Sequence, residues 1–191
     1  MRELSLHILD IAENAIAAGA DTIDIRVAER PSADNLTITL HDNGRGMPPD
    51  KLHHLDDPFV TTRRTRRVGL GLSLLTAAAK RCEGGVTATV QPGKGTTVTA
   101  VFRHSHIDRA PLGDIAGTLA TLIVGSPHID FIYTHSVEER AFILDTRRLK
   151  SEGLALSDPL TAAQLQELIR RSLAGLAGEA DAQNGKEAND A

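Results

Sequence analysis

The feature that most constrains this chain is a predicted β-strand that ends in an acidic, glycine-rich turn. Residues 36–40 alternate between apolar and polar side chains, as a strand with one buried face does, and Asp42, Gly44 and Gly46 follow them. Such a turn after a strand is common, and alone it indicates only a change of chain direction. A carboxylate at this place can also accept a hydrogen bond from the amino group of an adenine base. Asp42 is therefore a candidate base-binding residue.

Two further motifs, one on each side of the turn, favour the second interpretation. Apolar residues recur at helical spacing in residues 3–18, and Asp10 and Asn14 lie on a polar stripe of that helix. The side-chain oxygen of Asn14 is a suitable ligand for magnesium. Residues 69–72 contain two glycines and open a second helix, whose first backbone N–H groups can bind phosphate. Together the three motifs predict a site for ATP and Mg²⁺.

The composition gives no indication of nucleic-acid or membrane binding. The 191 residues carry a net charge of −4, which provides no general attraction to nucleic acid or to a membrane surface. Hydrophobic residues make up 41% of the chain, enough for a core, but no apolar segment is long enough to span a bilayer. The single cysteine, Cys82, excludes an internal disulfide and is typical of a reducing compartment. We expect a cytoplasmic protein.

The order of the predicted elements in residues 1–106 is that of an α/β sandwich, in which helices cover one face of a mixed sheet. The pattern predicts helix 3–18, strands 22–27 and 36–40, helix 49–55, an arginine-rich loop at 56–68, helix 70–82, and strands 86–90 and 96–102.

A smaller unit is predicted after this domain. Residues 107–174 are expected to form an α+β extension, with helix 112–124, strands 129–134 and 140–145, and helix 161–173. The apolar side of the hairpin at 129–145 needs a partner surface, which is offered by the adjacent helices, a second subunit or another protein. Residues 175–191 have little to bury, so we expect a disordered tail there.

The motifs of the first domain resemble those of the GHKL superfamily, which includes gyrase-type topoisomerases, heat-shock chaperone ATPases, histidine kinases and mismatch-repair ATPases. Residues 10–15 resemble its N box, residues 42–46 and 69–72 its two glycine boxes, and residues 95–97 its last motif. The resemblance covers roughly residues 3–103 and implies a Bergerat-type ATP-binding fold. Residues 58–63 are most similar to histidine kinases, and residues 13–20 to mismatch-repair proteins.

The resemblance implies a role for each matched residue. Asn14 would bind magnesium between the phosphates, and Asp42 would bind the adenine amino group with support from Thr96. The remaining ATP-binding positions that the resemblance implies are Gly44, Gly46 and Met47 around the base, Thr61, Thr62, Arg63 and Arg64 in a short lid, and Gly69, Leu70, Gly71 and Leu72 at the phosphates.

Asp10 is where this chain departs from the pattern. The ATP-hydrolysing branches place a glutamate four residues before the asparagine, and histidine kinases usually place an asparagine there. Asp10 is a shorter carboxylate, so it is a candidate for activating water but predicts slow hydrolysis. His7 lies one turn earlier on the same stripe, where we expect an ordinary polar role on the helix surface.

A second resemblance covers nearly the whole folded chain. The runs at residues 3–11, 105–114 and 130–135 are similar to a group of small stand-alone bacterial ATP-binding proteins, often encoded beside iron-hydrogenase subunits. This resemblance implies a regulatory protein with a separate, redox- or hydrogenase-associated protein partner, and a possible homodimer.

The sequence therefore predicts two alternative functions. The first is a kinase-like enzyme, of the histidine or serine protein kinase type, that transfers the γ-phosphate of ATP to a protein partner. The alternative is an ATP-dependent conformational switch or weak ATPase without phosphotransfer.

Overall fold

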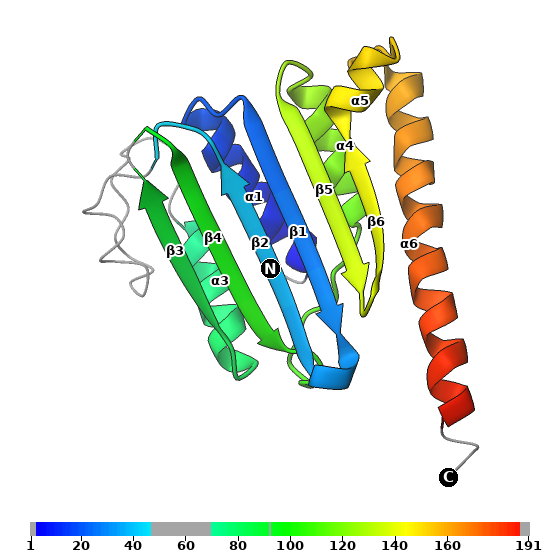
Figure 1. Cartoon of the computed structure of the whole chain (residues 1–191). Helices are drawn as coiled ribbons and strands as arrows, with labels where there is room; N and C mark the ends of the chain where they lie inside the picture. Colours follow the sequence, from blue (N-terminus) through cyan, green and yellow to red (C-terminus); the bar gives the residue numbers. More distant parts are fainter. Residues whose placement is uncertain (1–2, 47–69, 92, 188–191) are drawn as a thin grey trace.

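The protein folds around one mixed β-sheet whose helices lie mainly on one face (Figure 1). The computed structural model describes residues 3–46, 70–91 and 93–187. Within them the strands follow the order β3-β4-β2-β1-β5-β6 across the sheet. The strands are β1 (Thr22–Arg30), β2 (Asn35–Asp42), β3 (Gly85–Gln91), β4 (Gly95–Arg103), β5 (Asp130–Val137) and β6 (Arg140–Asp145). The helices are α1 (Leu4–Ala17), the 3₁₀ turn η1 (Pro31–Ala33), α3 (Leu70–Arg81), α4 (Ile115–Gly125), α5 (Thr146–Ser151) and α6 (Pro159–Glu187).

The α/β sandwich predicted from the sequence is confirmed. Each expected helix and strand within the described residues is present, with ends that differ by a few residues except in α6. The predicted helix at 49–55 and the loop at 56–68 lie outside the described residues.

The core lies between the sheet and the helices, because alternate strand residues point to the same face. Ile23, Ile25 and Val27 of β1 are at most 1% exposed, and they face the buried side of α1. On α1 the buried residues recur every three or four positions, from Leu4 to Ala15, which is the spacing of one helix face. Burial of such aliphatic side chains contributes about 1.5–3 kcal/mol each. This packing fixes α1, which carries the predicted polar stripe, against the centre of the sheet.

The extension does not form a separate layer, which changes the expected organisation. Strand β5 pairs in parallel with β1, from Thr22 beside Asp130 to Glu29 beside Val137. Strand β6 then pairs with β5 as the outer strand of the hairpin. The expected boundary after residue 106 therefore falls within one continuous sheet. Pairing between strands more than 100 residues apart has no local sequence signal, so the pattern of residues could not predict it.

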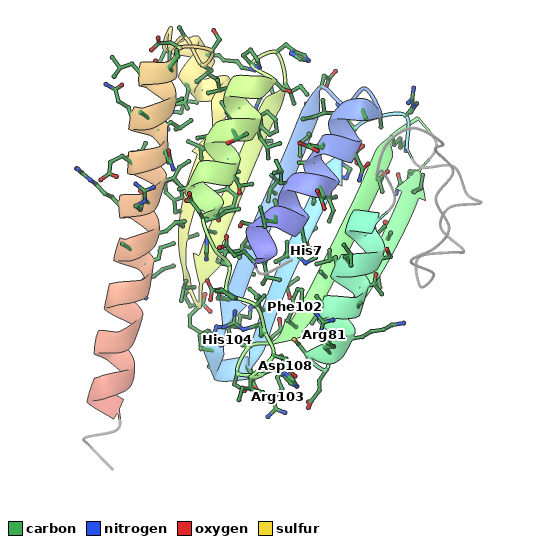
Figure 2. All side chains as sticks on the ribbon, turned by 180° about the vertical axis from the view of Figure 1, so that it is seen from behind. His7, Arg81, Phe102, Arg103, His104 and Asp108 are labelled. Atoms are coloured by element: carbon green, nitrogen blue, oxygen red, sulfur yellow. The ribbon has the colours of Figure 1, made fainter. Side chains whose placement is uncertain are left out.

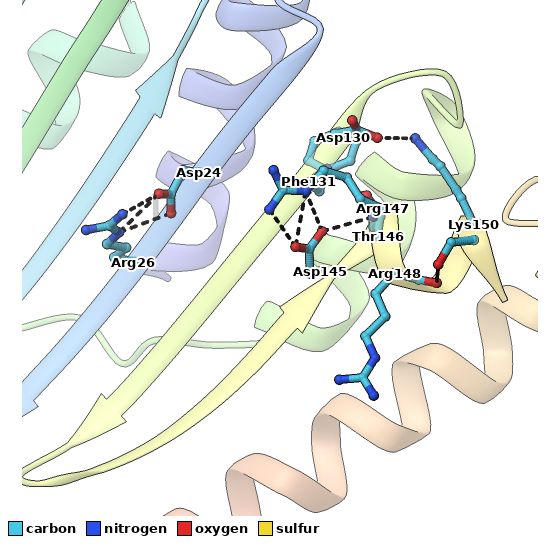
Figure 3. A network of polar contacts seen from close by, with 10 residues as sticks. Asp24, Arg26, Asp130, Phe131, Asp145, Thr146, Arg147, Arg148 and Lys150 are labelled. Atoms are coloured by element: carbon cyan, nitrogen blue, oxygen red, sulfur yellow. Dashed lines mark hydrogen bonds and ion pairs between the residues drawn. The ribbon is translucent and has the colours of Figure 1, made fainter.

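Helix α6 packs against both strands of the hairpin and α4 packs against α6, so the adjacent helices supply the partner surface that the hairpin needs. Phe131 and Tyr133 of β5 are each 1% exposed. Short polar contacts attach α5 to the same place (Figure 3): Lys150 donates to Asp130 Oδ1 at 2.7 Å, and the Phe131 amide donates to Thr146 Oγ1 at 2.8 Å. These bonds hold the hairpin to the connection that leads into α6.

Helix α6 is longer than predicted. It continues to Glu187, so residues 175–187 are helical and not the disordered tail that their composition suggested. The segment contains three Ala and two Glu residues, which have high helix propensity, although its three Gly residues do not. Leu165 and Ile169 anchor the helix in the core, and Arg140 Nη2 donates to the Leu176 carbonyl at 2.8 Å. Among the helices that the structure describes, none is both long and apolar enough to cross a membrane.

Candidate functional site

Asp42 is the last residue of β2, between β1 on one side and β4 on the other. It pairs with Ile23 and with Thr96, and its side chain is buried, as is that of Thr96. Its Oδ1 accepts a hydrogen bond from the Gly44 amide at 2.9 Å. Burial raises the pKa of Asp42, and the backbone N–H groups of Gly44 and Thr96 oppose that rise. A desolvated carboxyl group with a fixed orientation is well suited to accept one further bond from a ligand amino group.

Close backbone contacts explain the glycines around Asp42. Gly95 has a φ of 101°, and a Cβ there would lie 1.7 Å from the carbonyl oxygen of Asp42. Gly46 has a φ of 79°, and its Cβ would lie 2.8 Å from Cγ1 of Val90. Larger residues at these two positions would force β4 or β3 away from Asp42. The two glycines therefore allow β4 and β3 to pack closely beside Asp42.

Two residues within the glycine turn have structural roles that the sequence reasoning missed. Asn43 Oδ1 accepts from the amides of Asp21 and Thr22, each at 3.0 Å, which fastens the turn to the start of β1. The guanidinium of Arg45 donates to the Ala17 carbonyl at 3.2 Å and so satisfies the end of α1. Both contacts join segments that are distant in sequence, so no local sequence pattern predicts them.

The polar stripe of α1 faces the start of α3. Asn14 Nδ2 donates to the main-chain carbonyl of Asp10 at 2.9 Å, which orients the amide so that Oδ1 is the atom that could bind a metal. Asp10 lies against Gly71, because a Cβ on Gly71 would come within 2.8 Å of the Asp10 Cβ and 3.1 Å of its Oδ2. Burial raises the pKa of Asp10. The structure thus brings together the stripe and the first turn of α3.

His7 is not an ordinary surface residue, so that expectation was wrong. Its side chain is buried between α1 and α3, 3% exposed, and its Nδ1 has no hydrogen-bond partner among the described residues (Figure 2). Burial lowers the pKa of His7, and the backbone of Gly71 partly offsets this effect. The packing of α3 on the stripe covers the ring, and the sequence periodicity of α1 alone does not show where α3 docks.

Part of the predicted site lies at the start of α3, and part lies outside the described residues. Among the predicted residues, Gly71 and Leu72 lie in the first turn of α3, and Leu72 packs into the core. Leu70 begins the same helix. The predicted residues outside the described part of the chain are Met47, Thr61, Thr62, Arg63, Arg64 and Gly69.

The residues present fit a magnesium ion that is bound mainly by a nucleotide. The described residues contain no group of three or more His, Cys, Asp or Glu side chains placed to hold a metal. Magnesium commonly takes one or two protein oxygens together with substrate phosphates and water. The oriented Asn14 oxygen, next to a helix start that can bind phosphate, meets that requirement.

Comparison with known proteins gives the family. A family model described as "Histidine kinase-, DNA gyrase B-, and HSP90-like ATPase" matches residues 2–106. Among curated relatives, "Sensor kinase CckA" of Brucella abortus is 25% identical over 85% of this chain and 17% of its own length. "Sensor protein kinase FleS" of Pseudomonas aeruginosa is 37% identical over 56% of this chain and 26% of its own. The chain therefore spans about a quarter or less of these kinases.

Solved structures show the same fold at low sequence identity. The "Aquifex aeolicus MutL ATPase domain complexed with ADP" aligns with a TM-score of 0.50 and 13% identity, over 88% of this chain and 70% of that one. The N-terminal domain of a DNA repair protein aligns with a TM-score of 0.54 and 14% identity, over 76% and 53%. The match over residues 2–106, which contain both glycine boxes and the N box, shows that this chain belongs to the histidine kinase-, DNA gyrase B- and HSP90-like ATPase family, the GHKL superfamily.

Proposed function

We propose that this protein is a MgATP-binding regulatory protein that transfers the γ-phosphate of ATP to a separate protein partner. The observation that carries the proposal is the convergence of Asp42, Asn14 and the first turn of α3 around one end of the sheet. The family match supports ATP binding, and sensor kinases among the relatives support a kinase-like reaction.

Each residue has a distinct task in this proposal. Asp42 accepts the adenine amino group, with Thr96 beside it, and Gly44 and Gly46 allow the backbone to approach the base. Asn14 provides an oxygen to the magnesium ion, which neutralises phosphate charge when bound.

The proposed phosphate-binding residues are Leu70, Gly71 and Leu72 in the first turn of α3, where backbone N–H groups can bind phosphate, together with Gly69, which lies outside the described residues. Met47 packs on the base, and the lid residues Thr61, Thr62, Arg63 and Arg64 close over the phosphates. The guanidinium groups of the lid stabilise charge on the transferring group.

A second candidate is an ATP-dependent conformational switch or weak ATPase without phosphotransfer. The observation that favours it is Asp10, a short carboxylate held against Gly71 at the place where the hydrolysing branches use glutamate. In this case nucleotide binding changes the exposure of a docking surface, and turnover stays slow.

The partner is a separate protein, and we propose a redox- or hydrogenase-associated one on the strength of the resemblance of the 105–114 and 130–135 segments. A kinase of this kind needs an acceptor side chain in that partner.

The deciding experiment follows γ-labelled MgATP with the purified protein, using Asp42→Asn as the blank. Label on a protein establishes the phosphotransferase. Label released as free phosphate establishes the weak ATPase. ATP that is bound and returned intact establishes the switch, and absence of binding by the wild-type chain overturns all three.

A further inference from the structure

Within the part of the chain that the structure describes, one edge of the sheet has no further strand beside it. In the described residues β3 is the last strand at its end of the sheet, and β4 is its one strand partner (Figure 1). Its outer backbone N–H and C=O groups therefore face away from the sheet. An open edge is a ready template for another chain, so natural proteins usually protect it with charge, proline, a bulge or a covering element.

The two edges of this sheet differ in how well they are protected against pairing with another strand. At the opposite edge, β6 contains charged residues, among them Arg140 and Asp145, and α6 packs against it. Strand β3 has the sequence Gly-Val-Thr-Ala-Thr-Val-Gln, with no charged residue and no proline, and its pairing with β4 is regular from Gly85 to Gln91. The protection present at β6 is thus missing within β3 itself.

Residues 86–90 of β3, Val-Thr-Ala-Thr-Val, read the same in either direction about Ala88. Valines at 86 and 90 and threonines at 87 and 89 flank it symmetrically. If two copies pair antiparallel with Ala88 opposite Ala88, every Val meets a Val and every Thr meets a Thr. A two-fold interface requires such self-complementarity. Because β3 is neutral, no like charges face each other across the axis.

The helix layer is compatible with the same axis. Helix α3 packs on both β3 and β4. With strands about 4.8 Å apart, a helix above this pair would lie about 10 Å from its copy, a distance at which two helices pack. Val86, Ala88 and Val90 are half-buried on the helix side, whereas Thr87 and Thr89 are exposed on the open face.

From these observations we infer that β3 is a homodimer interface, in which two copies pair their β3 strands antiparallel about Ala88 and form one continuous sheet. Backbone hydrogen bonds hold the strands, and the symmetric side chains fix the register. The interface lies next to the nucleotide site, since Val90 contacts Gly46. The inference does not depend on the proposed function, because the pairing uses no nucleotide.

Charge variants on the exposed threonines test both the interface and its register. In the inferred register, position 87 of one copy faces position 89 of the other. The variant Thr87→Lys/Thr89→Lys places like charges opposite each other twice, so its dimer dissociation constant should rise by about tenfold or more. The variant Thr87→Lys/Thr89→Glu has the same two substituted sites but pairs opposite charges, so it should dimerise as the wild type does.

A mixture supplies the sharpest measurement. Thr87→Lys/Thr89→Lys and Thr87→Glu/Thr89→Glu, each weakened alone, should form a heterodimer when mixed, detected by sedimentation velocity over a range of concentrations. Unchanged circular dichroism melting shows that each variant folds. A monomeric wild-type chain, undiminished dimerisation of the double lysine variant, or no heterodimer on mixing would overturn the inference.

Discussion

Asp10 packs against Gly71 so closely that a Cβ at position 71 would lie 2.8 Å from the Cβ of Asp10. This contact joins α1, which carries the candidate metal-binding residue Asn14, to the start of α3, which we propose binds phosphate. The relative position of the two helices therefore sets the distance between the proposed metal-binding and phosphate-binding groups.

Gly71→Ala should separate these two helices. The added methyl group overpacks a tight contact, and overpacking typically costs about 1–3 kcal/mol. We expect this cost to reduce both the stability of the fold and the affinity for nucleotide. We expect a lower melting temperature and weaker MgATP binding in a calorimetric titration. Gly125→Ala is the matched control, because a Cβ there meets nothing within 4 Å. Equal behaviour of the two variants would show that the Asp10–Gly71 contact does not position the site.

Asp10→Glu should raise basal hydrolysis of ATP. The longer side chain reaches further from α1 toward bound phosphates, and a better placed base typically contributes about 10²-fold or more to a rate. The measurement is phosphate release at saturating MgATP, with Asp10→Asn as the isosteric control that cannot accept a proton. If Asp10→Glu binds MgATP normally but releases phosphate no faster than the wild type, Asp10 is not a water-activating residue.

Asp42→Asn should abolish measurable ATP binding while the fold persists. A lost hydrogen bond to a charged acceptor costs about 1.5–3 kcal/mol, and the new amide also presents a donor to the adenine amino group. Burial raises the pKa of Asp42, so its carboxylate becomes protonated at a higher pH than that of an ordinary aspartate. On acidification, ATP affinity should therefore start to decrease at that higher pH.

Protonation of Asp42 should weaken ATP binding but stabilise the fold. The folded protein protonates Asp42 more readily than the unfolded chain does, so acidification relieves the cost of burying its charge. Asp42→Asn should therefore melt at the same temperature as the wild type or higher at neutral pH. Unaltered ATP affinity in calorimetry would refute the assignment of Asp42 to the base.

Much of this fold is present in local patterns, and the rest depends on long-range contacts. Helix α1 and strands β1 to β4 follow from periodicity, and the two glycine boxes and the N box predicted the family from a few residues. The insertion of β5 beside β1 could not be predicted, because strand pairing depends on the whole sheet. The burial of His7 was missed for the same reason, since it depends on where α3 docks.

His7→Leu should make the protein more stable at mildly acidic pH. Burial lowers the pKa of His7 below its ordinary 6.5, so the unfolded chain binds the proton first and stability is lost as the pH falls through that value. Leucine removes both the titration and the unpaired Nδ1. The measurement is the free energy of unfolding in urea between neutral pH and pH values below 6.5, with the exposed His128→Gln as control. A wild-type pH dependence in His7→Leu would contradict the expectation.

Glu29 joins the extension to the rest of the sheet, and its removal should destabilise the whole chain. His135 Nε2 donates to Glu29 Oε1 at 2.8 Å, and the His104 ring contacts its other oxygen at 3.2 Å. Burial raises the pKa of Tyr133, so its phenol stays neutral and donates to His135 Nδ1 at 2.8 Å. Glu29→Ala leaves a buried imidazole without its acceptor, which costs about 1–3 kcal/mol.

The pH dependence identifies the charge as the cause. The hydrogen bond from His135 is the largest cause that lowers the pKa of Glu29, so its stabilisation is present above the ordinary value of 4.5. It is lost as the pH falls through the lower folded value. Glu29→Ala should therefore differ most from the wild type near neutral pH and least in acid, as measured by urea unfolding. Glu139→Ala, at an exposed site two residues from Val137 in the same hairpin, should show no such difference. A constant gap between Glu29→Ala and the wild type at every pH would mean that packing, and not the paired charge, holds β5 to β1.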